Sequence, residues 1–242
     1  PFSALEARIK RAGTPPEGMV YVPSRKYQVG KNGAGVSGPA YAVDLKEFYI
    51  DEREVSVSSY KKFLTRVKML GVAWKCTPDC PCGNDVTNHI PYKWDDQLKT
   101  PAAAVKGTNW WDASAYMKWR SKDVGQVVRL PTEQEMEVAS SWDLSKNEKR
   151  VYPWGNKFGT GKGVSFLRLT GLDNRLLEWT SSEWVPYPGF AGVFPREGKG
   201  DFVLRGGYKL DPKTDLKTWV RRGDRRRQQG RNYGFRCVRA IE

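Results

Sequence analysis

The sequence predicts one compact domain of the α+β class, in which short helices and short strands are joined by many loops. Three observations favour this class. The 242 residues are enough to bury one large hydrophobic core, although length alone leaves a split into two domains open. Helical spacing of apolar residues occurs in only a few short stretches, and the chain contains 24 glycines and 10 tryptophans. Turns and irregular loops packed by aromatic side chains therefore make up much of the predicted structure.

Residues 1–17 are predicted to form an N-terminal helix or linker ahead of a domain that spans residues 18–242. The stretch SALEARIKRA has a short helical pattern, which Gly13 and the following TPP end. The sequence begins at Pro1 without a methionine and carries no secretory signal peptide, so we expect a processed or excised piece of a longer protein. It contains no run of about 18 apolar residues, so no membrane span is predicted in this chain.

The elements of the domain are predicted as short strands and three helices. Alternating apolar residues in residues 18–30 predict a β-hairpin. The stretch FYIDEREVSVSSYKKFLTRV predicts a strand, a turn and a helix whose N-cap is Ser56. Asn109 is the expected N-cap of a second helix, and Thr132 with Glu135 has capping-box spacing at the start of a third. The rest is predicted as loops and short strands, and no internal repeat, dinucleotide fingerprint or phosphate loop occurs.

The positive charge of the chain is concentrated near its C-terminus. The net charge is +14, and the stretch from Lys213 to Arg239 holds ten Lys/Arg against two Asp, a balance of +8. Such a cluster raises the local concentration of anionic partners and speeds their encounter. The alternative interpretation is a solvated surface that only aids solubility.

Eight short blocks, taken in order, carry a resemblance to a known family. The blocks are GMVYVP, FYIDEREVSVSSYKKF, WWDASAYMKW, RLPTEQEMEVA, YPWGN, LEWTSSEW, LRGGY and GFRCVR. From Gly18 to Arg239 the chain resembles the formylglycine-generating enzyme (sulfatase-modifying factor) family. The resemblance implies an α+β, C-type-lectin-like fold with a groove built largely by C-terminal segments. Members include copper-dependent oxidases of a substrate cysteine, iron-dependent sulfoxide synthases and non-catalytic binding or scaffold domains, so the fold leaves the function open.

The metal ligands that the resemblance implies are mostly missing. In the copper oxidases a pair of cysteines follows the RGG turn, because soft thiolates suit a cuprous ion. The corresponding positions here fall near Asp211 and Leu216. The iron-dependent members need several histidines, whereas this chain has only His89, which is interpreted as a satisfied loop residue. We therefore predict no catalytic residues and no cofactor.

Calcium binding is also not expected. The family block GNVWEWT supplies an asparagine to a calcium site, and the matching stretch NRLLEWT places Arg175 there. The segment that follows YPWGN lacks acidic residues, so we predict no metal at either place. The family residues that remain are interpreted as core and capping residues. They are Arg129, Glu135, Trp154, Glu178 and Trp179.

The four cysteines depart from the family pattern as well. The resemblance implies a bridge between a helix cysteine and the one in GFRC, but Met117 occupies the first position, so Cys237 has no expected partner. Cys76, Cys80 and Cys82 are crowded into one loop, for which we predict a disulfide between Cys76 and one of the other two. A zinc site of these three thiols with His89 is the alternative, although the spacing is unusual for zinc. A disulfide would place the chain outside the cytoplasm, in the periplasm or secreted, with the cytoplasm as the alternative.

The function predicted from these observations is a non-catalytic binding or structural module with a basic C-terminal face, as a subunit of a larger assembly or a ligand-binding domain. Copper-dependent oxidation of a protein cysteine is the alternative. The expected partner is an acidic protein face, with an anionic glycan as a second candidate and nucleic acid less favoured, because no ordered base-stacking aromatics stand out among the arginines. The predicted binding residues are Trp219, Arg221, Arg222, Arg225, Arg226, Arg227 and Arg231. We expect replacement of all three arginines at positions 225–227 by serine to leave the melting temperature nearly unchanged. The alternative interpretation of Trp219 is that it is a core residue.

Overall fold

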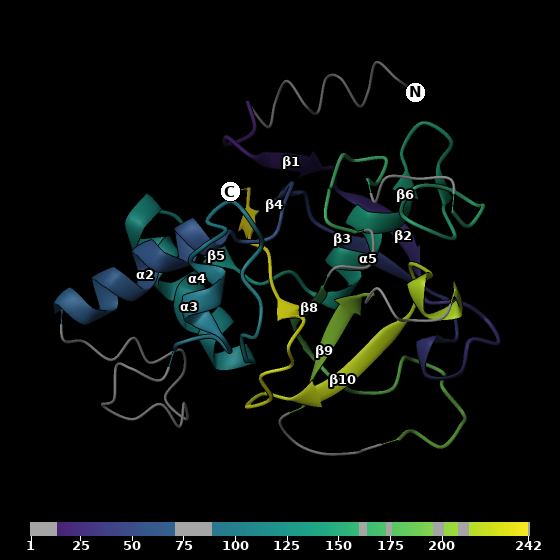
Figure 1. Cartoon of the computed structure of the whole chain (residues 1–242). Helices are drawn as coiled ribbons and strands as arrows, with labels where there is room; N and C mark the ends of the chain where they lie inside the picture. The colour runs from purple at the N-terminus through teal and green to yellow at the C-terminus, as the bar shows by residue number, and fades with distance from the viewer. Residues whose placement is uncertain are drawn as a thin grey trace.

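The computed structural model describes residues 14–70, 89–159, 164–172, 176–195, 201–207 and 213–241. Its strands are β1 (Met19–Val22), β2 (Arg25–Val29), β3 (Tyr41–Leu45), β4 (Phe48–Asp51), β5 (Val128–Arg129), β6 (Trp142–Asp143), β7 (Glu148–Lys149), β8 (Leu177–Glu183), β9 (Asp201–Gly206), β10 (Arg221–Arg225), β11 (Tyr233–Gly234) and β12 (Val238–Ala240). Its helices are α2 (Val57–Leu70), α3 (Trp94–Gln97), α4 (Trp110–Val124) and α5 (Glu133–Ser141), with the 3-10 turns η1 (Gly35–Ser37) and η2 (Lys213–Leu216). Figure 1 shows the arrangement of these elements. The predicted boundary at residue 17 stays a prediction, because residues 1–13 lie outside the described ranges.

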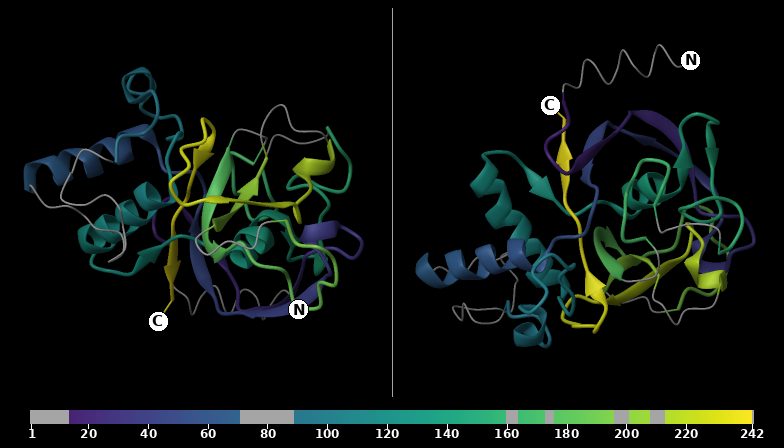
Figure 2. Two further views of the ribbon diagram at one scale, coloured as in Figure 1. Left: turned by 90° about the horizontal axis from the view of Figure 1, so that it is seen from below. Right: turned by 45° about the horizontal axis from the view of Figure 1, so that its top comes forward.

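Two four-stranded sheets organise the domain. The first has the strand order β1-β4-β12-β5, and its pairs are antiparallel. The second has the order β10-β9-β8-β11, in which only the β11–β8 pair is parallel. In both views of Figure 2 the end of the chain runs between helices α2 and α4 and the β8–β10 region. Strand β10 stands at one end of the order β10-β9-β8-β11 and is therefore an edge strand, with no strand paired on its other side in the described structure.

The predicted hairpin over residues 18–30 is wrong. Strand β1 pairs with β4, with Met19 opposite Asp51, whereas β2 pairs with β3, with Arg25 opposite Leu45. Pro23 and Ser24 separate β1 from β2, and neither supplies the positive φ that a two-residue hairpin turn requires. The apolar alternation identified the strands but not their partners.

The start signals of all three predicted helices are confirmed. The Ser56 hydroxyl accepts a hydrogen bond from the Ser59 N–H (3.1 Å) at the beginning of α2. Asn109 caps α4 and Thr132 caps α5, each in a complete capping box. These caps satisfy backbone N–H groups that have no partner within the helix. Within the described residues, no helix combines the length and the apolar character needed to cross a bilayer.

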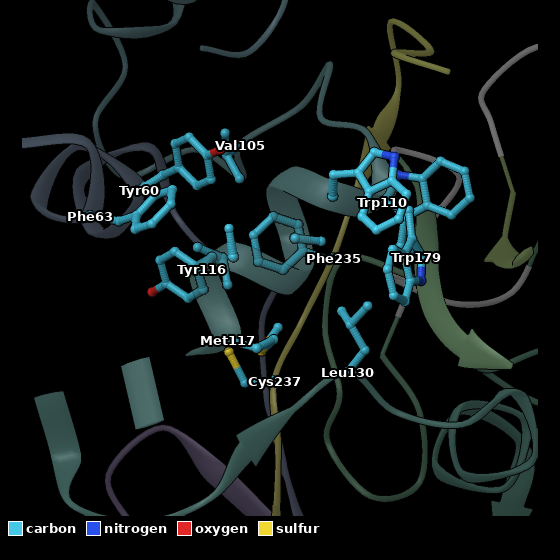
Figure 3. Close-up of a cluster of buried hydrophobic side chains, with 14 of the residues drawn as sticks. Tyr60, Phe63, Val105, Trp110, Tyr116, Met117, Leu130, Trp179, Phe235 and Cys237 are labelled. Carbon is cyan, nitrogen blue, oxygen red and sulfur yellow. The ribbon is translucent and has the colours of Figure 1, made fainter. Parts of the chain in front are cut away.

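The larger hydrophobic cluster packs α2 and α4 against the strands. Tyr60 of α2 stacks on Tyr116 of α4 with ring centroids 5.9 Å apart and the rings tilted by 10° (Figure 3). Trp179 of β8 is fully buried in the same cluster, and its indole N–H donates to the Thr108 carbonyl (3.0 Å). A second cluster joins β2, β4 and α5. Helix α5 is buried along most of its length, including the carboxylates of Glu133, Glu135 and Glu137.

Candidate functional site at the ends of strand β10

Five of the predicted binding residues form two separate groups, whereas Arg221 is buried and Arg222 is intermediate. Figure 1 shows β10 running from the side of β2 and β6 toward the side of α3 and α4. Trp219 precedes the strand, whereas Arg226, Arg227 and Arg231 follow it. Five residues of extended chain span about 15 Å. The structure therefore places Trp219 and the later arginines at opposite ends of β10.

Arg226 joins the loop after β10 to the start of α4. Its guanidinium lies 4.4 Å from the ring centroid of Trp111, and its carbonyl accepts a hydrogen bond from the Trp110 N–H (2.9 Å). The side chain is half-buried. An arginine stacked on an aromatic face in this way is held in place and contributes to stability as well as to charge. The prediction that serine at all three positions 225–227 leaves stability unchanged is therefore revised for Arg226.

The loop after β10 also contacts a segment with two exposed side chains, Ile90 and Tyr92. Arg231 lies with its guanidinium 5.6 Å from the ring centroid of Tyr92, and Gln229 donates to the Ile90 carbonyl (3.4 Å). Ile90 is 49% exposed and Tyr92 is 39% exposed. We call this surface the arginine face. It consists of Ile90, Tyr92, Arg225, Arg226, Arg227 and Arg231. All of these are exposed except Arg226, which is half-buried.

Trp219 lies among three lysines at the other end of β10. The ammonium groups of Lys31, Lys149 and Lys217 lie 5.9, 5.7 and 5.5 Å from the centroid of its ring. Trp219 is half-buried, so it is neither a fully exposed anchor nor a core residue. We call this group the lysine site. Sequence reasoning missed Lys31 and Lys149, which come from segments more than 60 residues away.

Arg221 is a correction to the predicted binding surface, because it is only 3% exposed. Its guanidinium donates to Glu133 Oε1 (2.8 Å) and lies 4.1 Å from the ring centroid of Tyr187. Arg205 stands directly opposite on β9 and donates to Glu137 Oε2 (2.8 Å) and Glu133 Oε2 (3.1 Å). Burial alone would lower the pKa of Arg205, but Tyr187 and both glutamates outweigh it and raise the pKa. Arg221 is thus a structural residue of a buried ionic network.

Arg222 is intermediate between these cases. Its side chain is 34% exposed, and its guanidinium pairs with Asp215 of η2 at 3.3 Å. Such a half-exposed pair contributes little to stability. Arg222 lies on β10 itself, between the lysine site and the arginine face, and belongs to neither.

The residues near the RGG turn do not fit a copper site. Leu216, at one expected ligand position, is a buried aliphatic residue of η2, and Asp211 lies outside the described residues. Cys237 is buried beside Met117 in the core (Figure 3). Burial raises the pKa of its thiol well above the usual range, and Asp51, which accepts the Cys237 N–H (2.9 Å), raises it further. A thiol held neutral in the core is a poor ligand for a metal ion.

His89 is a buried loop residue with a partner of its own. Its Nδ1 lies 3.0 Å from Asp112 Oδ1 on α4. Within the part of the chain that the structure describes, no group of three or more His, Cys, Asp or Glu is arranged to hold a metal ion. Cys76, Cys80, Cys82 and Arg175 lie outside the described residues. The disulfide, its zinc alternative and the compartment that they imply stay predictions.

The other family residues occupy structural positions. Glu178 accepts two hydrogen bonds from Arg236, at 2.6 and 2.7 Å, and both side chains are buried. Arg129 makes a bidentate pair with Glu135, at 2.7 and 2.6 Å, which closes the start of α5. Trp154 is half-buried and stacks on Tyr152 with ring centroids 5.5 Å apart. Bidentate pairs of this kind fix the relative orientation of the two side chains in addition to pairing their charges.

The comparisons with known proteins agree with this architecture. A family model described as the sulfatase-modifying factor enzyme 1-like domain matches residues 6–171. Hercynine oxygenase of Mycolicibacterium thermoresistibile is 26% identical over 208 residues, which cover 70% of this chain and 45% of that protein. Inactive C-alpha-formylglycine-generating enzyme 2 of Bos taurus is 29% identical over 170 residues, which cover 58% of this chain and 53% of that protein. The chain spans about half the length of these two relatives.

A solved structure supports the fold independently. PvdO from Pseudomonas aeruginosa superposes with a TM-score of 0.61 at 19% identity, over 92% of this chain and 94% of that chain. At this identity the likeness concerns the fold alone. The family model covers more than half of the sequence. The chain therefore belongs to the family of sulfatase-modifying factor enzyme 1-like domains and has the α+β, C-type-lectin-like fold of the formylglycine-generating enzyme type.

Proposed function

We propose that the chain is a non-catalytic binding module of its family, and that the arginine face binds an acidic surface of a protein partner. The observation that carries this proposal is the run of exposed arginines after β10, of which Arg231 contacts the exposed ring of Tyr92. Arginine and tyrosine are enriched in interface hot spots, because a guanidinium pairs with carboxylates in a bidentate way while the ring supplies buried area. Within the described residues, the guanidinium groups of Arg225, Arg227 and Arg231 form no ion pair with a carboxylate. Their charges are available to a partner protein.

The arginine face also rests on a rigid scaffold. The Arg226 carbonyl accepts from the Trp110 N–H (2.9 Å), and the Tyr233 carbonyl accepts from the Thr108 N–H (3.1 Å). The Gln229 side chain ties the same loop to Ile90. A loop that is already ordered loses less conformational entropy when it binds. This supports recognition of a folded partner.

Nucleic acid and glycan partners are less well supported. Binding of single-stranded nucleic acid uses several exposed rings on which successive bases stack. On the arginine face Tyr92 is exposed, whereas Trp110 and Trp111 are buried. A sulfated glycan would use the charges but leave the apolar surface of Ile90 unused. The test below therefore includes both as competing ligands.

The non-catalytic part of the proposal rests on the missing thiolate pair. Leu216 cannot ligate a metal, and Cys237 is buried with a raised pKa. One relative carries the name of an inactive enzyme. Cuprous-ion titration of the purified chain with a cysteine-containing peptide separates the two functions. Tight copper binding with formation of an aldehyde on the peptide would overturn the non-catalytic proposal, whereas an unmodified peptide agrees with it.

The binding part is tested by fluorescence anisotropy with a labelled, glutamate-rich peptide. The variant Arg225→Ser/Arg227→Ser/Arg231→Ser removes three exposed charges from the arginine face. We expect at least about tenfold weaker binding, and raised salt should imitate the loss in the wild type. The control is Lys61→Ser/Lys62→Ser/Lys68→Ser, which removes three exposed charges from α2 and should bind like the wild type.

Three outcomes contradict the proposal. The first is an equal loss of affinity in the arginine variant and the lysine control, which would indicate attraction by net charge alone. The second is peptide binding that the arginine variant leaves intact. The third is tighter binding of heparin or a single-stranded oligonucleotide than of the peptide with the same dependence on the arginines, which would identify another class of partner.

A further inference from the structure

We propose that the lysine site, made of Trp219, Lys31, Lys149 and Lys217, binds a phosphate monoester independently of the arginine face. The three ammonium groups lie 5.9, 5.7 and 5.5 Å from the Trp219 ring centroid. They come from three separate segments, namely the turn after β2, strand β7 and the turn before β10. Lys149 is paired with Glu137, whereas Lys31 and Lys217 place two further ammonium groups near the same ring without a carboxylate partner among the described residues, and such like charges repel. An anionic ligand would relieve that repulsion.

Hydrogen bonds to backbone carbonyls hold the three segments of the lysine site together. Thr218, next to Trp219, donates its N–H to the Val151 carbonyl (2.9 Å) and its hydroxyl to the Arg150 carbonyl (2.7 Å). The Lys149 ammonium donates to the Gly30 carbonyl (2.6 Å), which fixes the residue before Lys31. The site is therefore positioned by the fold rather than by mobile side chains alone, and a preorganised site loses less entropy on binding.

Glycine at position 30 is required for this arrangement. Its φ is +72°, and a Cβ there would lie 2.7 Å from the Pro39 carbonyl oxygen. The Gly30 N–H also donates to Glu137 Oε1 (2.8 Å), which accepts from Lys149 as well. The close approach of this backbone to α5 places Lys31 directly after a residue that contacts both Glu137 and Lys149. Other residues would be strained at this φ.

The charges around the lysine site do not balance. Lys149 pairs with Glu137, but that carboxylate also accepts from Arg205 through its other oxygen. Lys31 and Lys217 have no carboxylate partner among the residues that the structure describes. Burial lowers the pKa of Lys149, and Arg205 and Lys31 lower it further against the pull of Glu137. Two positive charges at the site therefore remain uncompensated.

A phosphate monoester matches this surplus best. It carries about 1.5 to 2 negative charges at neutral pH and three acceptor oxygens. Lysines act on phosphate as compact point charges, whereas planar carboxylates are better matched by the fork of an arginine. A carboxylate or a sulfate monoester carries one charge and would leave one lysine uncompensated. The half-buried indole of Trp219 offers an apolar surface to the organic part of the ester.

The test uses isothermal titration of the full chain with inorganic phosphate, phenyl phosphate, phenyl sulfate and benzoate. We expect phenyl phosphate to bind most tightly, with inorganic phosphate weaker and phenyl sulfate and benzoate at least about tenfold weaker, consistent with their smaller charge. The variant Lys31→Ala/Lys217→Ala should bind phenyl phosphate at least about tenfold more weakly than the wild type. The control Lys61→Ala/Lys68→Ala removes the same charge from exposed positions on α2 and should leave the affinity for phenyl phosphate unchanged.

Two further variants define the site. In Trp219→Leu the advantage of phenyl phosphate over inorganic phosphate should disappear, whereas Arg225→Ser/Arg227→Ser should bind phenyl phosphate like the wild type. The melting temperature of Lys31→Ala/Lys217→Ala should stay equal or rise, since like-charge repulsion is removed. The proposal is overturned if the wild type binds no phenyl phosphate, if benzoate binds as tightly, if the α2 control loses as much affinity, or if the arginine variant abolishes binding.

Discussion

Arg221 and Arg225 lie on the same face of strand β10, four residues apart, yet one is buried and the other is exposed. Arg221 meets a carboxylate of α5 and the rings of Tyr187 and Trp184. Gly223, between the two, lies so close to Trp184 that a Cβ there would come within 2.2 Å of the ring. Beyond Trp184 the described residues show no contact of this kind with Arg225, which is exposed. The carboxylates and rings that face the strand, rather than the residue type, decide whether an arginine is structural or available for binding.

The buried arginines also show how the fold accommodates like charges. Arg205 and Arg221 are directly opposite across the β9–β10 pair, an arrangement that is unfavourable for two cations. Glu133 and Glu137 are four residues apart on α5 and therefore point to the same side, where Glu133 accepts from both guanidiniums and Glu137 accepts from Arg205. The exposed arginines face solvent in place of these carboxylates, and water and dissolved salt screen the repulsion between their charges.

The largest effect is expected from breaking the buried network. Arg205→Met leaves Glu133 and Glu137 without their shared partner, and we expect a loss of about 3–5 kcal/mol in the free energy of unfolding. Urea denaturation measures this loss. Arg225→Met makes the same chemical change at the exposed position and should stay within about 0.5 kcal/mol of the wild type. Similar losses in the two variants would remove the distinction between buried and exposed arginines.

An intermediate effect is expected at the half-buried Arg226. Its guanidinium stacks 4.4 Å from the Trp111 ring centroid, so Arg226→Ala should cost about 1 kcal/mol in unfolding free energy. Arg227→Ala is the matched control, because Arg227 is exposed. If both alanine variants unfold at the urea concentration of the wild type, the stacking does not contribute to stability.

The ion pair of Arg150 with Asp143 is expected to make a smaller contribution to stability, and one that depends on pH. Burial alone would raise the pKa of its partner Asp143, but hydrogen bonds from Ser145 and Arg150 outweigh burial and lower the pKa. The unfolded chain then binds the proton more readily, so the stabilisation is present above the ordinary Asp pKa and is lost as the pH falls through the folded value. We expect the stability advantage of the wild type over Asp143→Asn to shrink between about pH 4 and pH 2. An advantage independent of pH in acid titrations would contradict this.

The smallest effect on stability is expected at the exposed end. Arg225→Ser/Arg227→Ser/Arg231→Ser should change the free energy of unfolding by about 0.5 kcal/mol or less, since none of the three is buried. Thermal and urea unfolding of the variant measure this change. A loss above about 2 kcal/mol would place these arginines with Arg221 among the structural residues.

Local features of the fold could be predicted from the sequence. The caps at Ser56, Asn109 and Thr132 act on backbone N–H groups a few residues away, so short sequence patterns contain the needed information. Strand pairing is different. Residues 19–22 pair with residues 48–51, and nothing in either stretch alone identifies the other. The order of the family blocks supplied the fold that local patterns could not.

The candidate site was predicted only in part for the same reason. A basic run in the sequence favours a surface, but the carboxylate that buries Arg221 lies 88 residues before it. Lys31 and Lys149 were missed because they reach Trp219 through tertiary packing. The spacing of Glu133 and Glu137 was a usable signal, since two carboxylates on one face of a buried helix require cations opposite them. Arg225, Arg227 and Arg231 lie at the surface because no such partner faces them in the described structure.

The central claim is that burial divides the arginines of this domain into structural and binding groups, and arginine-selective modification tests it most directly. The folded chain is treated with phenylglyoxal, with and without a glutamate-rich peptide, and the modified residues are mapped by mass spectrometry. We predict that Arg225, Arg227 and Arg231 react rapidly and are protected by the peptide, whereas Arg205 and Arg221 stay unmodified in both conditions. Rapid modification of Arg221, or a peptide that protects none of the three exposed arginines, would contradict the account.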